Sequence, residues 1–138
     1  MLPSTFAGSP RAVHQCYMDA MALVRRFGKP DYFITMTANP AWPEIKAHLR
    51  WQETAAGRPD LVARVFRIKF EALLADLLER QVLGRVVAFT YVIEFQKRGL
   101  PHGHLLATVQ GPDKIKAASA IDARVCAELP PHGKTCLL

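Results

Sequence analysis

The sequence predicts an α+β domain in which helices pack on an antiparallel sheet. Two long stretches, 10–27 and 60–80, repeat apolar residues at helical spacing. Two strand-like stretches, 86–95 and 102–109, are separated by a turn of six residues. Strands joined by so short a connection pair antiparallel, because a parallel pair needs a much longer crossover. Half of the 138 residues are hydrophobic, which is enough to build the core of one domain.

The first helix is expected between Ser9 and Gly28. Ser9 and Pro10 form a typical start, an N-cap residue followed by proline at the first helical position. Glycine is a typical residue just after the end of a helix. Apolar side chains recur between these ends at helical spacing, at Val13, Tyr17, Met21 and Val24.

The next element is expected to be a strand over residues 31–37. These residues read Asp-Tyr-Phe-Ile-Thr-Met-Thr, and their β-branched and aromatic content favours a strand. Phe33 and Thr35 then share one face, because alternate side chains of a strand point the same way. Asn39-Pro40 ends the strand, and a short helix and a loop are expected to follow.

A long amphipathic helix is expected from Asp60, as its N-cap, to about Arg80. Gly84 ends the turn that follows. The apolar residues of this helix step by three or four positions and form one stripe, made of Val62, Phe66, Phe70, Leu73 and Leu77.

The most strand-like stretch of the chain is 86–95, with the sequence VVAFTYVIEF. A turn with glycine and proline separates it from 102–109, HGHLLATV, so the two are expected to form an antiparallel hairpin at the centre of the sheet. The strand over 31–37 is expected in the same sheet.

The C-terminal part is less regular. Residues 114–121 are expected to form a short helix and 125–129 a short strand. The domain is therefore placed at residues 1–129, and 130–138 form an irregular tail.

The chain is basic, with a formal net charge of +6. A basic domain of this size is compatible with a polyanionic partner such as nucleic acid. The three cysteines are widely spaced, which suggests free thiols in a reducing, intracellular compartment. Neither a secretory signal nor an apolar run long enough to cross a membrane is visible, so no membrane partner is expected.

The strongest chemical signal is the pair His102 and His104. Residues two apart on a strand point to the same face, and Glu94, eight residues before His102, lies across the expected hairpin. Imidazole favours Mn²⁺, Zn²⁺ or Co²⁺, whereas a carboxylate with open positions suits Mg²⁺ or Mn²⁺. Such an open site can act as a Lewis acid on phosphates. From the residues alone, a structural or solvated histidine pair remains the alternative.

Two segments carry a resemblance to a known family. Phe33–Pro40, FITMTANP, and Tyr91–Leu106, YVIEFQKRGLPHGHLL, resemble the Rep domain of Helitron transposons, also called the Helitron helicase-like N-terminal domain. Shorter matches occur at Gly8–Arg11, Phe27–Asp31 and Arg58–Phe66. The resemblance covers roughly residues 2–129.

The resemblance implies membership of the HUH endonucleases of rolling-circle transposition. In that superfamily a divalent metal polarises the scissile phosphate of single-stranded DNA, and a tyrosine attacks it and stays bound to the 5′ end. Carried over to this sequence, the resemblance implies that Glu94, His102 and His104 bind Mg²⁺ or Mn²⁺.

DNA contacts are expected around that metal site. The resemblance matches the strand and Asn39 to the first conserved motif of the family, which contacts DNA, so Thr35, Thr37 and Asn39 are expected DNA contacts. Lys97 and Arg98, in the turn beside the metal site, are the other two expected contacts. Trp42 and Trp51 are candidates for stacking on bases, with helix packing as the alternative.

Two features depart from the family pattern. Gly103 stands where the family has an apolar residue, and a glycine is expected to weaken the packing of the strand. The family's paired tyrosines lie on a helix well downstream of the histidines, whereas Tyr17, Tyr32 and Tyr91 all precede them and match no nucleophile motif. The chain is therefore expected to be C-terminally truncated, without the tyrosine and helicase regions of the full-length relative.

A final motif looks like part of a nucleotide-binding loop but is incomplete. Gly133-Lys134-Thr135 resembles the end of a phosphate-binding P-loop, but Glu128 stands where that motif needs glycine, so no helicase activity is expected.

The sequence thus favours an incomplete Rep-type domain that binds a divalent metal and single-stranded DNA without catalytic tyrosines. Two alternatives stay open. One is an endonuclease that becomes active when a missing C-terminal part is supplied, and the other is a functionless relic of a degraded transposon. A nuclear location is expected if the transposition role is retained.

Overall fold

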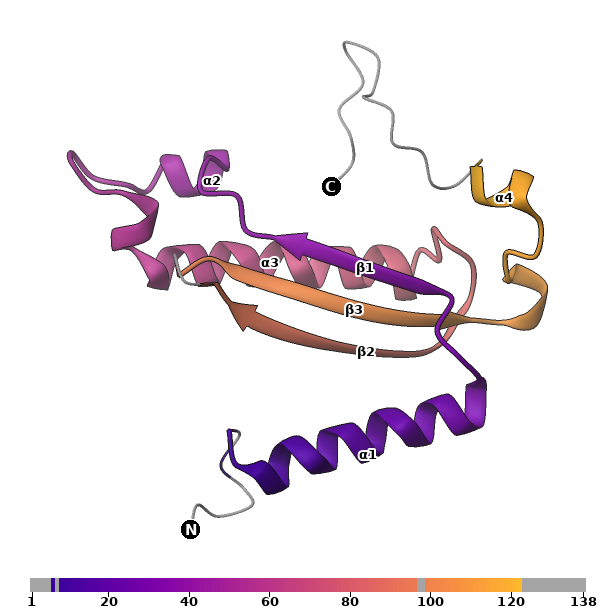
Figure 1. Ribbon diagram of the computed structural model, residues 1–138. Coiled ribbons are helices and arrows are strands. Elements are labelled where there is room, and N and C mark those ends of the chain that lie inside the picture. The colour runs from indigo at the N-terminus through magenta and orange to yellow at the C-terminus, as the bar shows by residue number, and fades with distance from the viewer. Residues whose placement is uncertain (1–5, 7, 97–98, 123–138) are drawn as a thin grey trace.

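The computed structural model describes residue 6, residues 8–96 and residues 99–122 of the chain. Figure 1 shows their arrangement. The helices are α1 (Pro10–Phe27), α2 (Pro43–Lys46), α3 (Pro59–Leu78) and α4 (Ala118–Asp122), and the strands are β1 (Tyr32–Thr37), β2 (Val86–Phe95) and β3 (Pro101–Val109). The expected α+β class is confirmed. In the part of the chain that the structure describes, no helix is both long and apolar enough to cross a membrane.

The three strands form one antiparallel sheet in the order β1-β3-β2. The strand with the two histidines, β3, is central, and β1 joins the same sheet as expected. β2 differs from the expectation, because it lies at an edge of the described sheet rather than at its centre. The sheet lies between α3 on one face and α1 on the other (Figure 1).

Alternating residues of β3 point to these two faces. Gly103, Leu105 and Ala107 are buried on the α3 side, where they pack against its aromatic and aliphatic side chains. His102 and His104 point to the side on which α1 lies. The histidines therefore occupy the face that α3 does not cover.

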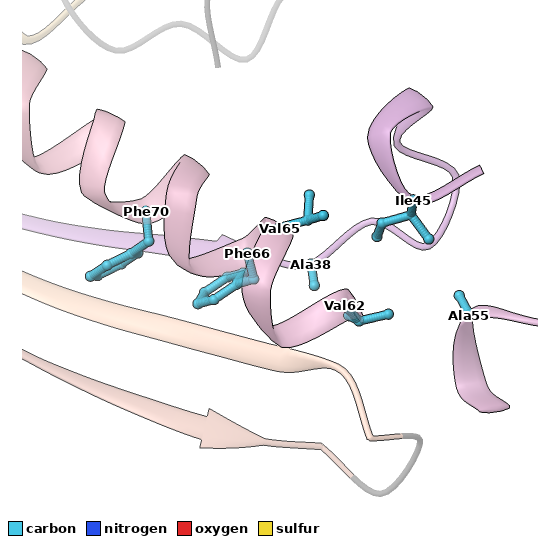
Figure 2. Close-up of a cluster of buried hydrophobic side chains, with 7 residues drawn as sticks. All are labelled: Ala38, Ile45, Ala55, Val62, Val65, Phe66 and Phe70. Carbon is cyan, nitrogen blue, oxygen red and sulfur yellow. The ribbon is translucent and has the colours of Figure 1, made fainter. Parts of the chain in front are cut away.

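The core lies around α3, which packs on the sheet and on the segment between β1 and α3. The expected stripe of α3 is confirmed, with Val62, Phe66, Phe70 and Leu77 buried and Leu73 packed beside them. Figure 2 shows how the first half of α3, with Val62, Val65, Phe66 and Phe70, packs against the segment between β1 and α3, which contributes Ala38, Ala55 and Ile45 of α2. In contrast, none of the 18 described residues of α1 is buried.

The helix ends follow sequence signals, with one correction. Ser9 caps α1, because its hydroxyl accepts a hydrogen bond from the Ala12 N–H, and Gly28 ends the helix with a φ of 88°. In α3 the N-cap is Arg58 and the helix begins at Pro59, so Asp60 lies in the first turn and is not the cap. The signal that prevailed is proline at the first helical position.

In the C-terminal part, the expected helix over 114–121 is shorter and later than predicted, at Ala118–Asp122. The expected strand at 125–129 and the tail at 130–138 lie outside the described residues.

Candidate functional site: the histidine face of the sheet

The strand register places the predicted site residues in two neighbouring rows. His102 pairs with Thr37 on one side and Glu94 on the other. Two residues along β3, His104 pairs with Thr35 and Val92. Side chains paired across an antiparallel sheet share a face and lie close together. Both threonines, both histidines and the glutamate therefore share one face.

His102 is held by its neighbour in β1. Its Nδ1 forms a hydrogen bond with Thr37 Oγ1, and its ring lies edge-on to the ring of His104, with the centroids 4.4 Å apart. Because the hydroxyl occupies Nδ1, the other ring nitrogen, Nε2, is the one available to a further partner. Thr37 thus orients His102 in the way that supporting hydrogen bonds orient metal-binding histidines.

His104 is held by an aromatic ring. It stacks on Phe33 of β1 with an interplanar angle of 6° and a centroid distance of 5.5 Å. Its Nδ1 is buried and has no hydrogen-bond partner among the described residues. A buried polar atom in this state is uncommon and points to a water or an ion that completes it.

Gly103, between the two histidines, makes room for α3. A Cβ built on this glycine would lie 2.6 Å from Cε2 of Phe70, far closer than two carbons can approach. The Phe70 ring is buried and also packs on Phe66 and Tyr91. The expectation that Gly103 weakens the packing is therefore wrong here, because the Phe70 ring fills the space of the missing side chain.

A groove separates α1 from the histidine face. Its volume is about 510 Å³, and its border includes Tyr17 of α1, Phe33 of β1, Val92 of β2, and His104 and Leu106 of β3. Phe33 is 65% exposed and Tyr17 58% exposed. An aromatic groove thus adjoins the histidine pair.

A second groove, of about 460 Å³, runs along the outer edge of β1. Three predicted DNA contacts, Thr35, Thr37 and Asn39, line it together with Trp42 and Lys69. Asn39 Oδ1 also accepts a hydrogen bond from the Ala41 N–H, which fixes the chain after β1. The other two predicted DNA contacts, Lys97 and Arg98, lie outside the described residues.

Lys69 of α3 lines this second groove. Its Nζ donates a hydrogen bond to Glu44 and sits 5.1 Å from the centroid of the Trp42 ring. That hydrogen bond lowers the pKa of the Glu44 carboxyl below its usual range. One face of Trp42 is therefore covered by a cation, whereas Trp51 is 91% exposed.

The three predicted metal ligands share a face, but their side chains do not gather into a ligand group. Over residues 6, 8–96 and 99–122, no three His, Cys, Asp or Glu side chains lie close enough together to hold one ion. The structure brings together His102 and His104, whose rings are in contact, and places Glu94 opposite His102 across the strands.

The three tyrosines divide between the two faces. Tyr32 pairs with Ala107 and Tyr91 with Leu105, so both lie on the α3 side, and Tyr91 packs on Phe70. Tyr17 borders the groove beside His104. Tyr91 also lines this groove, although its ring packs on Phe70 on the α3 side.

The sequence reasoning did not select Phe33, Tyr17 or Phe70 for the site. Phe33 could have been predicted as a site residue, because alternation along β1 places it on the same face as Thr35. The roles of Tyr17 and Phe70 depend on how α1 and α3 pack, and no local pattern encodes that.

Comparison with known proteins gives one family. Residues 1–107 match the family described as the Helitron helicase-like domain at the N-terminus. No curated protein matches the chain significantly. The match spans both β1 and the histidine pair of β3, and it covers well over half of the chain. The chain therefore belongs to the family of Helitron helicase-like N-terminal domains.

Proposed function

We propose that this domain binds a divalent metal ion and single-stranded DNA on the histidine face, as a Rep-type HUH domain does. One observation carries the proposal. The register aligns Glu94, His102 and Thr37 in one row of the sheet, with His104 in the next row, on the face that α3 leaves uncovered. Membership of a transposon-related family supports a role in DNA transactions.

The donor types suit a divalent cation, and the three side chains would have to lie closer together than in this structure to hold one ion. Two imidazoles and a carboxylate are the mixed ligands that suit Mn²⁺, and Mg²⁺ with more of its waters kept. The unpartnered Nδ1 of His104 is a buried atom that lacks a partner among the described residues. His102 and His104 would hold the ion together with Glu94, and Thr37 would orient His102.

A metal bound there would supply Lewis-acid polarisation of a phosphate oxygen. The chain's own residues supply the rest of the surface. Thr35 and Thr37 offer hydroxyls on the same face, and hydroxyls are common donors to phosphate oxygens. The net charge of +6 favours a polyanion and predicts affinity that falls with added salt.

The proposal includes DNA binding without cleavage by residues 1–138. The described positions of Tyr32 and Tyr91, on the α3 face, separate both from the histidines. Tyr17 borders the groove beside His104, but it matches no nucleophile motif of the family.

Isothermal titration with Mn²⁺ tests the metal site. The protein should bind Mn²⁺, and His102→Ala should abolish the binding while circular dichroism shows an intact fold. His48→Ala is the matched control, because His48 is exposed and its Nδ1 contacts Glu44 O, away from the sheet. Unchanged binding by His102→Ala would reject the site.

Incubation with end-labelled single-stranded DNA and Mn²⁺ tests the second part of the proposal. We expect binding without nicking and without a covalent adduct on the 5′ end. An adduct that Tyr17→Phe removes would show instead that this chain holds its own nucleophile. Failure of the wild-type protein to bind either Mn²⁺ or DNA would favour the alternative function, a relic without metal or DNA binding.

A further inference from the structure

The groove between α1 and the histidine face has the composition of a stacking site. Phe33 is an aromatic residue of the sheet, yet 65% of it is exposed, and its ring already stacks parallel to His104. Tyr17, 58% exposed, borders the same groove from α1. Two exposed aromatic side chains thus flank one hollow next to the histidine pair.

We propose that this groove takes one unpaired nucleobase of the DNA strand, stacked on Phe33 beside His104. This inference rests on the proposed function. It adds a site at which the protein binds the DNA strand through a base rather than through a phosphate. Stacking on aromatic side chains is the usual way in which proteins hold single strands, and it tolerates any base sequence.

The size and lining of the groove suit a base. A volume of about 510 Å³ lies in the range of small-molecule sites and leaves room for one nucleotide. The floor is apolar at Val92 and Leu106 and polar at His104, which matches the apolar faces and polar edges of a base. A base inside a duplex has its faces stacked on neighbouring bases, so the groove selects unpaired DNA.

The charge of α1, the helix that forms one wall of the groove, suits the backbone that would carry the base, although none of the described arginines lines the groove itself. The α1 helix holds three arginines, Arg11, Arg25 and Arg26, against one acidic residue, Asp19. The whole chain carries +6. A polyanion passing between α1 and the sheet is therefore attracted, whereas an acidic surface would repel it.

The test measures binding of a short labelled deoxyoligonucleotide by fluorescence anisotropy in the presence of Mn²⁺. Phe33→Ala should weaken binding by roughly five-fold to a hundred-fold, the usual loss for one stacked base. Phe33→Tyr, which keeps a flat ring, should restore affinity, whereas Phe33→Leu, which keeps apolar bulk, should not. Mn²⁺ is kept at a saturating concentration for every variant, because Phe33 also stacks on His104 and its loss can weaken the metal site.

Phe95→Ala is the matched control. Phe95 is 63% exposed, nearly the same as Phe33, but it pairs with Pro101 on the other face of the sheet. Its truncation should leave DNA binding unchanged. Equal losses for both variants would mean that no specific base site lies beside His104 and would overturn the inference.

Abasic substitutions separate a base contact from a fold effect. Removing one particular base should weaken binding to the wild-type protein, but should cost the Phe33→Ala variant little, because the two changes remove the same contact. If every abasic position costs both proteins equally, the stacking site is rejected while metal-dependent DNA binding still stands. If the wild-type protein binds no single-stranded DNA at all, the proposed function fails, and this inference fails with it.

Discussion

The two faces of the sheet differ in how completely they are covered. On the α3 face, Leu105 and Ala107 are each 1% exposed and Phe70 is 3% exposed. On the histidine face, Phe33 is 65% exposed and Val92 50% exposed, and α1 buries none of its own residues there. The sheet is thus packed where α3 covers the central strand and open around the histidines, although the edge strand β2 keeps Tyr91 and Phe95 exposed on the α3 side.

This difference separates the source of stability from the candidate site. Burial of apolar area is the main favourable term in folding, and both buried clusters lie around α3, where it packs on the sheet and on the segment between β1 and α3. The side chains proposed to bind metal and DNA lie on the opposite face of the same strands, so a rigid scaffold positions them without enclosing them. Substitutions should therefore affect folding on one face and binding on the other.

The largest expected effect is on the packed face. Phe70→Ala should lower the free energy of unfolding by about 3–5 kcal/mol, the usual cost of removing a buried aromatic side chain. The ring contacts Phe66 and Tyr91 and covers Gly103, so its loss leaves a cavity against β3. Urea denaturation measures the change.

Phe33→Ala is the comparison for this prediction, because the same residue type is truncated on the open face. Its effect on the free energy of unfolding should stay within about 0.5 kcal/mol. Equal losses at the two positions would contradict the division between the faces.

The next effect concerns the glycine between the histidines. Gly103→Val installs the kind of apolar residue that the family resemblance leads us to expect, but it should destabilise the domain by about 1–3 kcal/mol through overpacking. The cause is the 2.6 Å approach of a Cβ to the buried Phe70 ring.

Phe70→Leu tests this mechanism. Combined with Gly103→Val, it should give a smaller loss of stability than the sum of the two single losses, because the smaller side chain makes room for the valine. Strictly additive losses in urea denaturation would show that the valine acts through something other than Phe70.

The Phe70–Gly103 contact also marks what the sequence can and cannot predict. The stripe of α3 follows from helical spacing along the chain. The bounds of β2 follow from its β-branched and aromatic composition. The contact between Phe70 and Gly103 joins two elements through tertiary packing, and no local pattern encodes it. A glycine in a strand then looks like a weakness when seen without its partner.

The candidate site shows the same limit. Alternation along the strands predicts that Glu94, His102 and His104 share a face, and the register agrees. It does not tell which face a helix covers, so the exposure of Phe33 and the position of Tyr17 could not be foreseen. The start of α3 was misplaced by two residues, because Asp60 and Pro59 offered competing start signals and the proline prevailed.

A smaller effect is expected on the open face, at the threonine that contacts His102. Thr37→Val removes the hydroxyl that bonds Nδ1 while keeping the shape of the side chain. Loss of such a supporting hydrogen bond should weaken Mn²⁺ binding by roughly 10–100-fold. Thr35→Val is the control, since Thr35 pairs with His104, and no hydrogen bond between their side chains is described. Equal titration curves for the two variants would remove Thr37 from the site.

The smallest effect is expected at the start of the helix that covers the packed face. Arg58 donates two hydrogen bonds to the Asp60 carboxylate, and these lower the pKa of Asp60 from 3.8 to about 2. Since the folded pKa lies below the unfolded one, the pair stabilises the domain above a pH of about 4, and this contribution is lost as the pH falls toward about 2. The pair is largely exposed, so solvent screens it and the contribution is small.

Asp60→Asn should therefore lower Tm slightly at neutral pH, and the difference from wild type should vanish in acid, as thermal melts at a series of pH values can show. A Tm difference that stays constant over the whole series would mean that the charge of Asp60 contributes nothing to the start of α3.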